Sequence, residues 1–149
     1  IAIQMTVDLS SSMNDLDLSP PGQRMTRLAV VKDVFRKFVL GDKKSLKGRE
    51  NDLIGMVTFA RFADSVCPLT LDHENVLKVL ESVQTIPPAR QQEEDGTAIG
   101  NGLALAVERL RDLKRTSGSG QQLAIRSRVV ILLTDGQENA SVNCSRSVR

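Results

Sequence analysis

Several residue types are scarce in this sequence of 149 residues, and each scarcity narrows the possible functions. There is no Trp, no Tyr and only four Phe, so few side chains are available for stacking on nucleic-acid bases. The formal net charge of +2 is too small to indicate a nucleic-acid or acidic-membrane surface. We therefore expect no nucleic-acid partner.

Cysteine and long hydrophobic runs are also lacking. The two cysteines, Cys67 and Cys144, have no C-x-x-C spacing, which favours neither a disulfide framework nor a zinc site, so we interpret both as isolated thiols. No stretch of 18 consecutive apolar residues occurs, and the start lacks the pattern of a signal peptide. Any membrane attachment is expected to lie in segments outside this chain.

The composition that remains is that of an ordinary globular protein. Hydrophobic residues make up 40% and charged residues 26% of the chain. A chain of this length can bury roughly two-thirds of the surface that its unfolded form exposes. We expect a single domain over residues 1–149.

Hydrophobic periodicity predicts alternating strands and helices. Predicted strands cover residues 1–8, 53–60, 65–71 and 127–136. Predicted helices cover about 25–40 and 97–115, and a short helix marked by Val76, Leu77, Leu80 and Val83 begins near His73. This order predicts a doubly wound α/β sheet with helices on both faces.

Connection lengths indicate the strand directions. A crossover helix joins the first two strands, which should therefore be parallel. Only Arg61–Asp64 separates the second strand from the third, so the third should turn back as an antiparallel edge strand, a position that tolerates Pro68. The continuous apolar run of the last strand is typical of a strand covered on both faces.

Polar side chains follow the first and last predicted strands and precede the last helix. Ligands of such sheets bind at the carboxyl ends of strands, where successive crossovers leave on opposite faces. If the two strands are neighbours, five oxygen-bearing side chains converge there. These candidates are Asp8, Ser10, Ser12, Thr97 and Asp135.

Carboxylates and hydroxyls are hard oxygen ligands, which match Mg²⁺, Mn²⁺ or Ca²⁺ rather than zinc or copper. Magnesium usually keeps several waters and suits a site with few protein ligands, so we expect Mg²⁺ or Mn²⁺ ahead of Ca²⁺. Neutral hydroxyl ligands would leave the ion receptive to a carboxylate from outside. Such chemistry makes a binding site rather than a catalyst.

Other interpretations of the same residues are less favoured. Each motif alone is common turn or helix-cap chemistry, and the presence of all three in this order argues against that interpretation. The chain has no G-x-x-x-x-G-K-[ST] loop, and the lone histidine, His73, is expected to be a surface or capping residue. Glu93, Glu94 and Asp95 read as a solvated loop, although Asp95 lies close enough to Thr97 to support the site.

The segments "DLSSS", "DGTAIG" and "LLTDG" resemble the metal-ion-dependent adhesion site of von Willebrand factor type A domains, and the resemblance covers essentially the whole chain. Further stretches, such as "RLAVVKDVFRKF", are similar to bacterial, membrane-anchored members of the Bat aerotolerance type. The resemblance implies a Rossmann-like fold, a magnesium or manganese ion, and an open coordination position for an Asp or Glu of a protein partner.

The resemblance also implies roles for individual residues. Ser10 and Ser12 would contact the metal directly and Thr97 would do so in the ligand-ready state, whereas Asp8 and Asp135 would hold it through water or hydrogen bonds. Ser11 stands in the variable position of the motif and is expected to be dispensable for the ion.

Domains of this family normally continue past the fourth strand, so the resemblance implies that the C-terminal part of the usual domain is missing. The last strand would then be an apolar sheet edge prone to self-association. A metal-dependent protein-interaction module, not an enzyme, is the favoured function. An accessory domain of a chelatase-type ATPase machine or a metal-dependent hydrolase is the alternative.

Overall fold

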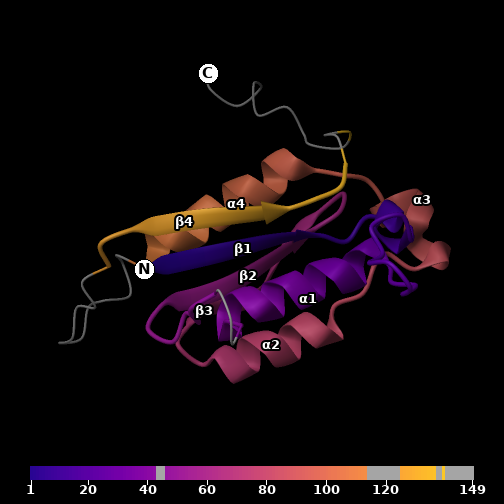
Figure 1. Ribbon diagram of the computed structural model, residues 1–149. Helices are drawn as coiled ribbons and strands as arrows, with labels where there is room; N and C mark the ends of the chain where they lie inside the picture. Colours follow the sequence, from indigo (N-terminus) through magenta and orange to yellow (C-terminus); the bar gives the residue numbers. More distant parts are fainter. Residues whose placement is uncertain (43–45, 114–124, 137–138, 140–149) are drawn as a thin grey trace, which may run out of the picture.

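The computed structural model describes residues 1–42, 46–113, 125–136 and 139. Its helices and strands follow the alternating order that the sequence predicts (Figure 1). In chain order they are β1 (Ala2–Asp8), η1 (Ser11–Asn14), α1 (Arg27–Leu40), β2 (Leu53–Phe59), β3 (Ala63–Thr70), α2 (His73–Ser82), η2 (Pro88–Arg90), α3 (Gln91–Glu94), α4 (Ile99–Asp112) and β4 (Arg128–Leu133).

The four strands form one sheet in the order β3-β2-β1-β4. β1 pairs in parallel with β2 and with β4, and β3 pairs antiparallel to β2 at the edge. The predicted mostly parallel sheet with one antiparallel edge strand is therefore confirmed. Val7 pairs with Leu133, so β1 and β4 are direct neighbours and end side by side.

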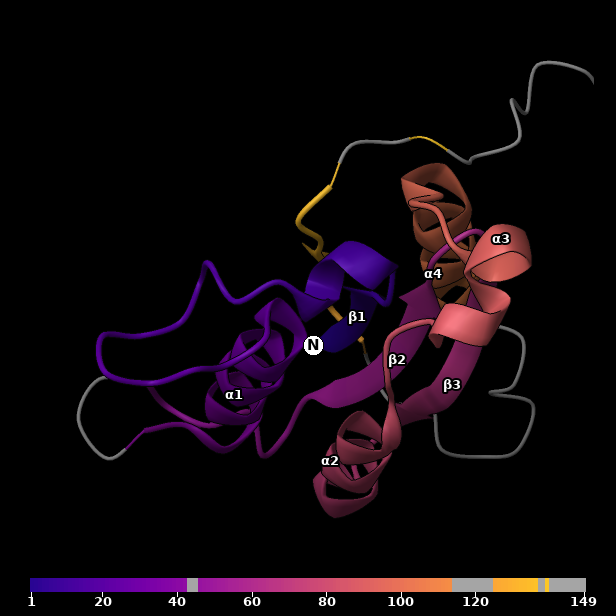
Figure 2. The same cartoon turned by 90° about the vertical axis from the view of Figure 1, so that its right-hand side faces the viewer.

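Helices cover both faces of this sheet, as predicted (Figures 1 and 2). Every residue of β1 is buried. Met5 belongs to a core cluster that includes Phe35 of α1 and Leu80 of α2. On the opposite face, a Cβ atom on Gly102 of α4 would lie only 2.9 Å from the Phe59 ring, so glycine allows α4 to approach the sheet closely.

Side chains cap the starts of α1 and α2; α1 begins two residues later than predicted, and α2 begins where predicted. α1 begins at Arg27 rather than 25, since the hydroxyl of Thr26 accepts a hydrogen bond from the amide of Ala29 at 3.1 Å. α2 begins at His73, where Asp72 accepts from the amide of Asn75. The predicted end of the last helix, at residue 115, lies outside the described residues. Cys144, which is predicted to be an isolated thiol, lies outside them as well.

The acidic segment before Thr97 is helical, which corrects the predicted solvated loop. Pro88 begins η2, and its fixed backbone angle suits the first residues of a helix. α3 follows at once, with Glu93 and Glu94 in its first turn, where negative charge is favourable. The carbonyl of Glu94 accepts a hydrogen bond from the amide of Arg61, which ties α3 to the β2–β3 turn.

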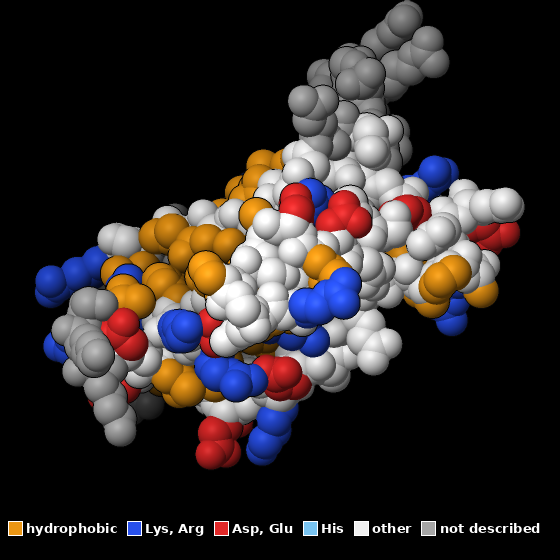
Figure 3. All heavy atoms as spheres, turned by 45° about the vertical axis from the view of Figure 1, so that its right-hand side comes forward, with side chains coloured by type: hydrophobic (Ala, Val, Ile, Leu, Met, Phe, Trp, Pro, Cys, Tyr) orange, Lys and Arg blue, Asp and Glu red, His pale blue; other side chains and the backbone are white. Residues whose placement is uncertain are grey.

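Among the described residues, β4 forms the other edge of the sheet and is only partly buried, which corrects the expectation from its apolar run that both its faces are covered. Its first two residues are exposed and the rest are half-buried; Val129 is 39% exposed. Ile131 and Leu133 are only partly buried against the main core. Figure 3 shows several apolar side chains close together on one exposed face of the molecule. Self-association through this edge stays a prediction.

The candidate metal site

The predicted site lies where β1 and β4 end beside each other. β1 ends at Asp8 and the chain turns into η1, whereas β4 ends at Leu133 and is followed by Thr134, Asp135 and Gly136. One crossover, through α1, packs on one face of the sheet and α4 packs on the other, so this is the point where the connections diverge (Figure 1).

Asp8 is fully buried, and both its oxygens are hydrogen-bonded. The amide of Ser10 donates to Oδ1 at 2.8 Å, and the hydroxyl of Thr134 donates to Oδ2 at 2.6 Å. Burial raises the pKa of Asp8, and the nearby charge of Asp135 raises it further, against the opposing effect of these hydrogen bonds. The site thus holds a desolvated carboxylate, which a cation would stabilise.

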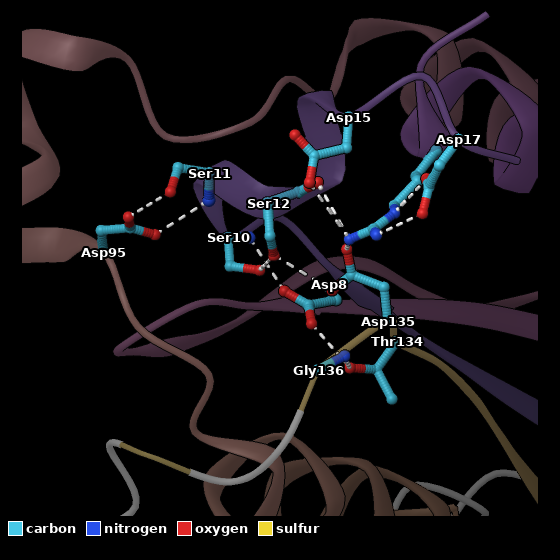
Figure 4. A network of polar contacts seen from close by, with 11 residues as sticks. Asp8, Ser10, Ser11, Ser12, Asp15, Asp17, Asp95, Thr134, Asp135 and Gly136 are labelled. Atoms are coloured by element: carbon cyan, nitrogen blue, oxygen red, sulfur yellow. Dashed lines mark hydrogen bonds and ion pairs between the residues drawn. The ribbon is translucent and has the colours of Figure 1, made fainter.

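Two serine hydroxyls lie between the carboxylates of Asp8 and Asp135. The Oγ atoms of Ser10 and Ser12 are 3.1 Å apart, and Ser12 donates to Oδ1 of Asp135 at 3.1 Å. Figure 4 shows these side chains turned toward one another from the β1–η1 segment and the end of β4. The structure therefore brings four of the five predicted residues into one hydrogen-bonded cluster.

Thr97 lies beside Gly136, which directly follows Asp135, in the segment that precedes α4. It is buried, and a Cβ atom on Gly136 would lie 3.4 Å from its hydroxyl oxygen. Its amide donates to Oδ1 of Asn139 at 2.7 Å, and its carbonyl accepts from the amide of Asn139. Both bonds use the backbone of Thr97, which is therefore bonded to Asn139 and not within the helix. α4 begins at Ile99 rather than at the predicted 97.

Arg27 is a member of the site that sequence reasoning missed. Its guanidinium donates to Oδ2 of Asp135, to the carbonyl of Ser12 at 3.4 Å, and through two nitrogens to Asp17 at 2.7 and 2.6 Å. The bonds to Asp17 and Asp135 raise the pKa of Arg27. No local pattern in the sequence indicates this role, because the contact joins Arg27 to a carboxylate 108 positions along the chain.

Asp95 joins the loop before α4 to the loop after β1. Its Oδ1 accepts from the Ser11 amide at 2.9 Å, and its Oδ2 accepts from the Ser11 hydroxyl at 2.5 Å. Partial burial acts to raise the pKa of Asp95, but the hydrogen bonds from Ser11 and Gly96 outweigh it and the pKa is lowered. Asp95 therefore ties the segment before α4 to the turn after β1 through its two hydrogen bonds with Ser11.

The donor set fits a hard cation. The described residues contain no group of three or more His, Cys, Asp or Glu side chains arranged to hold a metal. What they bring together is the carboxylates of Asp8 and Asp135 and three hydroxyls, all oxygen donors with no thiolate or imidazole among them; the hydroxyls are those of Ser10, Ser12 and Thr134. Such a set suits magnesium or manganese with retained water molecules and does not suit a soft or nitrogen-seeking metal.

Comparison with known proteins identifies the family of this chain. Residues 4–137 match the von Willebrand factor type A domain family. The chain belongs to this family. One curated relative of the domain, an uncharacterized protein of Borreliella burgdorferi, is 29% identical over 138 residues, which are 93% of this chain and 33% of the relative.

Solved structures agree with the assignment. A membrane-spanning protein from Vibrio fischeri is 31% identical with a TM-score of 0.61, covering 73% of this chain and 48% of that one. An aerotolerance-related membrane protein from Bacteroides fragilis is 31% identical with a TM-score of 0.59, covering 87% and 52%. The resemblance to the Bat type is thus confirmed, and the chain spans a third to about half of these relatives.

Proximal thread matrix protein 1 of the mussel byssus, in a form with a zinc-occupied metal-ion-dependent adhesion motif, has the same fold. It is 24% identical with a TM-score of 0.56, covering 93% of this domain and 29% of that chain. Within the described residues of this domain, no helix is long and apolar enough to span a membrane.

Ser11 and Asp95 provide a first test of how this domain is held together. The variant Ser11→Ala should lower the free energy of unfolding by about 1–2 kcal/mol, because it removes a hydrogen bond to a charged carboxylate. Ion binding should be unchanged, since the Ser11 hydroxyl faces Asp95 and not the other serines. Urea unfolding and metal titration measure the two effects.

Ser82→Ala is the matched control for this test. Its hydroxyl bonds the carbonyl of Val79 on an exposed part of α2, so its loss should change the free energy of unfolding by less than about 0.5 kcal/mol. Loss of ion binding in Ser11→Ala would contradict the separation between the Ser11–Asp95 contact and the ion site.

Proposed function

We propose that this domain is a metal-dependent protein-interaction module. It binds Mg²⁺ or Mn²⁺ where β1 and β4 end beside each other, and through that ion it binds an Asp or Glu side chain of a protein partner. The residues proposed to hold the ion are Asp8, Ser10, Ser12, Thr97 and Asp135.

The observation that carries this proposal is the pair of serine hydroxyls between two buried carboxylates. Ser10 and Ser12 are neutral ligands, and both carboxylates are already hydrogen-bonded by other groups. An ion held mainly by neutral ligands keeps most of its positive charge, and a carboxylate from outside can neutralise it. When bound, the ion supplies this electrostatic bridge between the two proteins.

The choice of ion follows from the ligands. Oxygen donors favour magnesium and manganese, and calcium is less favoured because it takes six to eight oxygen ligands, usually with several carboxylates. The byssus protein shows that the same motif can hold zinc in one relative, which supports a divalent cation here without fixing its identity.

An enzymatic role has less support. The chain has a single histidine, and its Nε2 lies 2.8 Å from the carbonyl of Asp52, just before β2 begins. That is the opposite end of the parallel strands from Ser10 and Ser12, so His73 cannot act as their general base. An accessory role beside an ATPase on another chain would use the same interaction site.

The similarity to membrane proteins bears on whether the domain belongs to a membrane-anchored protein. The relatives from Vibrio fischeri and Bacteroides fragilis are described as membrane proteins and extend well beyond the matched part. We propose that this domain is the partner-binding part of a bacterial membrane-anchored protein whose anchor lies outside the chain described here.

Titration calorimetry with Mg²⁺ and with Mn²⁺ tests the ion site. The unmodified domain should bind one ion, and Ser12→Ala and Thr97→Ala should each weaken binding by at least about tenfold, because each removes an oxygen ligand. Thr85→Ala is the matched control, since its hydroxyl bonds the side chain of Asn14 away from the site. Equal affinities in all four proteins would refute the assignment.

A further inference from the structure

Arg27 is the feature of the site that its proposed function does not use. The guanidinium is 19% exposed and makes ion pairs with three carboxylates: Asp135, which is 7% exposed, and the more exposed Asp15 and Asp17. It reaches the site from the first residue of α1, whereas Asp135 follows β4. Figure 4 shows Asp15, Asp17 and Asp135 near one another at the edge of the cluster.

Arg27 and Ser12 together give each oxygen of Asp135 a hydrogen-bond partner. Oδ2 accepts from the guanidinium and Oδ1 accepts from the hydroxyl of Ser12. The fork formed with Asp17 fixes the guanidinium plane, because two parallel N–H donors meet two carboxylate oxygens at 2.7 and 2.6 Å. Asp135 is thus held on one side by a cation that belongs to the protein.

Arg27 also changes the charge that the site offers. Asp8 and Asp135 are the two buried carboxylates, and the guanidinium stands in direct contact with one of them. A guanidinium stays protonated at every accessible pH, so its positive charge is permanent. A cation entering beside the serines therefore meets a smaller net negative charge than two carboxylates alone would present.

We propose that Arg27 limits the negative charge of the site through its contact with Asp135, so that the site selects divalent over trivalent cations and leaves a bound ion accessible to an acidic partner. This inference rests on the proposed function of the same site. It adds a residue that sets how strongly, and for which ionic charge, the site binds.

The test compares Mn²⁺ and Tb³⁺ binding to the domain and to Arg27→Gln, by calorimetry and terbium luminescence. Coulomb energies scale with ion charge, so loss of the guanidinium should tighten Mn²⁺ binding by about tenfold and Tb³⁺ binding by about thirtyfold. Arg27→Lys retains the charge and should remain close to the unmodified domain for both ions. A purely structural role would weaken both ions equally and would not depend on their charge.

Arg36→Gln is the matched control, because it removes the same charge from α1 at an exposed ion pair with Glu81. It should leave both affinities unchanged. Weaker or unchanged binding in Arg27→Gln, or an equal change for the two ions, overturns the proposal. Absence of ion binding in the unmodified domain, or binding that survives Ser12→Ala unchanged, would instead refute the proposed function.

Asp17→Asn keeps the test decisive if circular dichroism shows that Arg27→Gln does not fold. This variant leaves Arg27 in contact with Asp135 but removes one of the two exposed carboxylates that offset its charge. Both ions should then bind more weakly, with Tb³⁺ affected more than Mn²⁺. Tighter or unchanged binding of either ion by Asp17→Asn would contradict the role assigned to Arg27.

Discussion

Asp8→Ala is expected to weaken Mg²⁺ and Mn²⁺ binding by about 100-fold, because carboxylates that orient metal ligands typically contribute this much to affinity. Asp8 is fully buried and holds the amide of Ser10 and the hydroxyl of Thr134. Its loss removes one of two negative charges and also frees the turn that presents Ser10. Titration calorimetry measures the affinity directly.

A second substitution separates the charge of Asp8 from its shape. Asp8→Asn keeps an oxygen that can accept from the Ser10 amide, so the turn should persist while the negative charge is lost. Ion binding should still fall strongly, which would identify charge as the larger contribution. Asp33→Ala is the matched control, because it removes a carboxylate from an exposed ion pair with Lys37 on α1. Binding by Asp8→Ala at the affinity of this control would contradict the site.

Ion binding should also stabilise the fold, because a ligand that binds only the folded state shifts the unfolding equilibrium. At an Mg²⁺ concentration 100 times its dissociation constant, the gain is about 2.7 kcal/mol. Asp8→Ala should lose this gain while Asp33→Ala keeps it, and unfolding in the presence and absence of Mg²⁺ shows the difference.

Phe35→Ala is expected to lower the free energy of unfolding by about 3–5 kcal/mol, the usual cost of removing a fully buried phenylalanine. Phe35 is 0% exposed and packs in the core between α1 and the sheet. Total stabilities of domains are about 5–15 kcal/mol, so the loss is a large share of what holds this fold together. Urea unfolding followed by circular dichroism provides the measurement.

Phe62 offers a control of the same chemical type. It lies in the turn between β2 and β3 and is 64% exposed, so Phe62→Ala leaves no internal cavity. Its effect on the free energy of unfolding should stay within about 0.5 kcal/mol. Similar losses in both variants would mean that α1 does not pack on the sheet through Phe35. Because α1 also carries Arg27, its packing fixes one side of the ion site.

Local patterns in the sequence were enough to predict much of the fold. The period of apolar residues in 25–40 predicts a helix with one buried side, and α1 buries Leu28, Phe35 and Val39. The short connection after β2 and the presence of Pro68 predict an antiparallel edge strand, which β3 is. These features depend on residues that are close together in the sequence, so they can be predicted without the tertiary structure.

Local patterns give wrong predictions where the contacts of a segment come from residues far away in the sequence. A run of apolar residues predicts burial on both faces, yet β4 lies at an edge of the sheet and stays half-exposed. Glu93 and Glu94 read as a loop because acidic residues are common in loops, although Pro88 and the contact with Arg61 support a short helix.

The sequence by itself determined which oxygen ligands are present and that they follow the ends of strands. Asp8, Ser10 and Ser12 are close in sequence, so their spacing alone indicates one turn with several oxygens. Only the tertiary structure decided what these oxygens meet. Arg27 contacts Asp135 across 108 positions and Ser11 contacts Asp95 across 84, and such pairs form only because strand order and helix packing bring distant segments together.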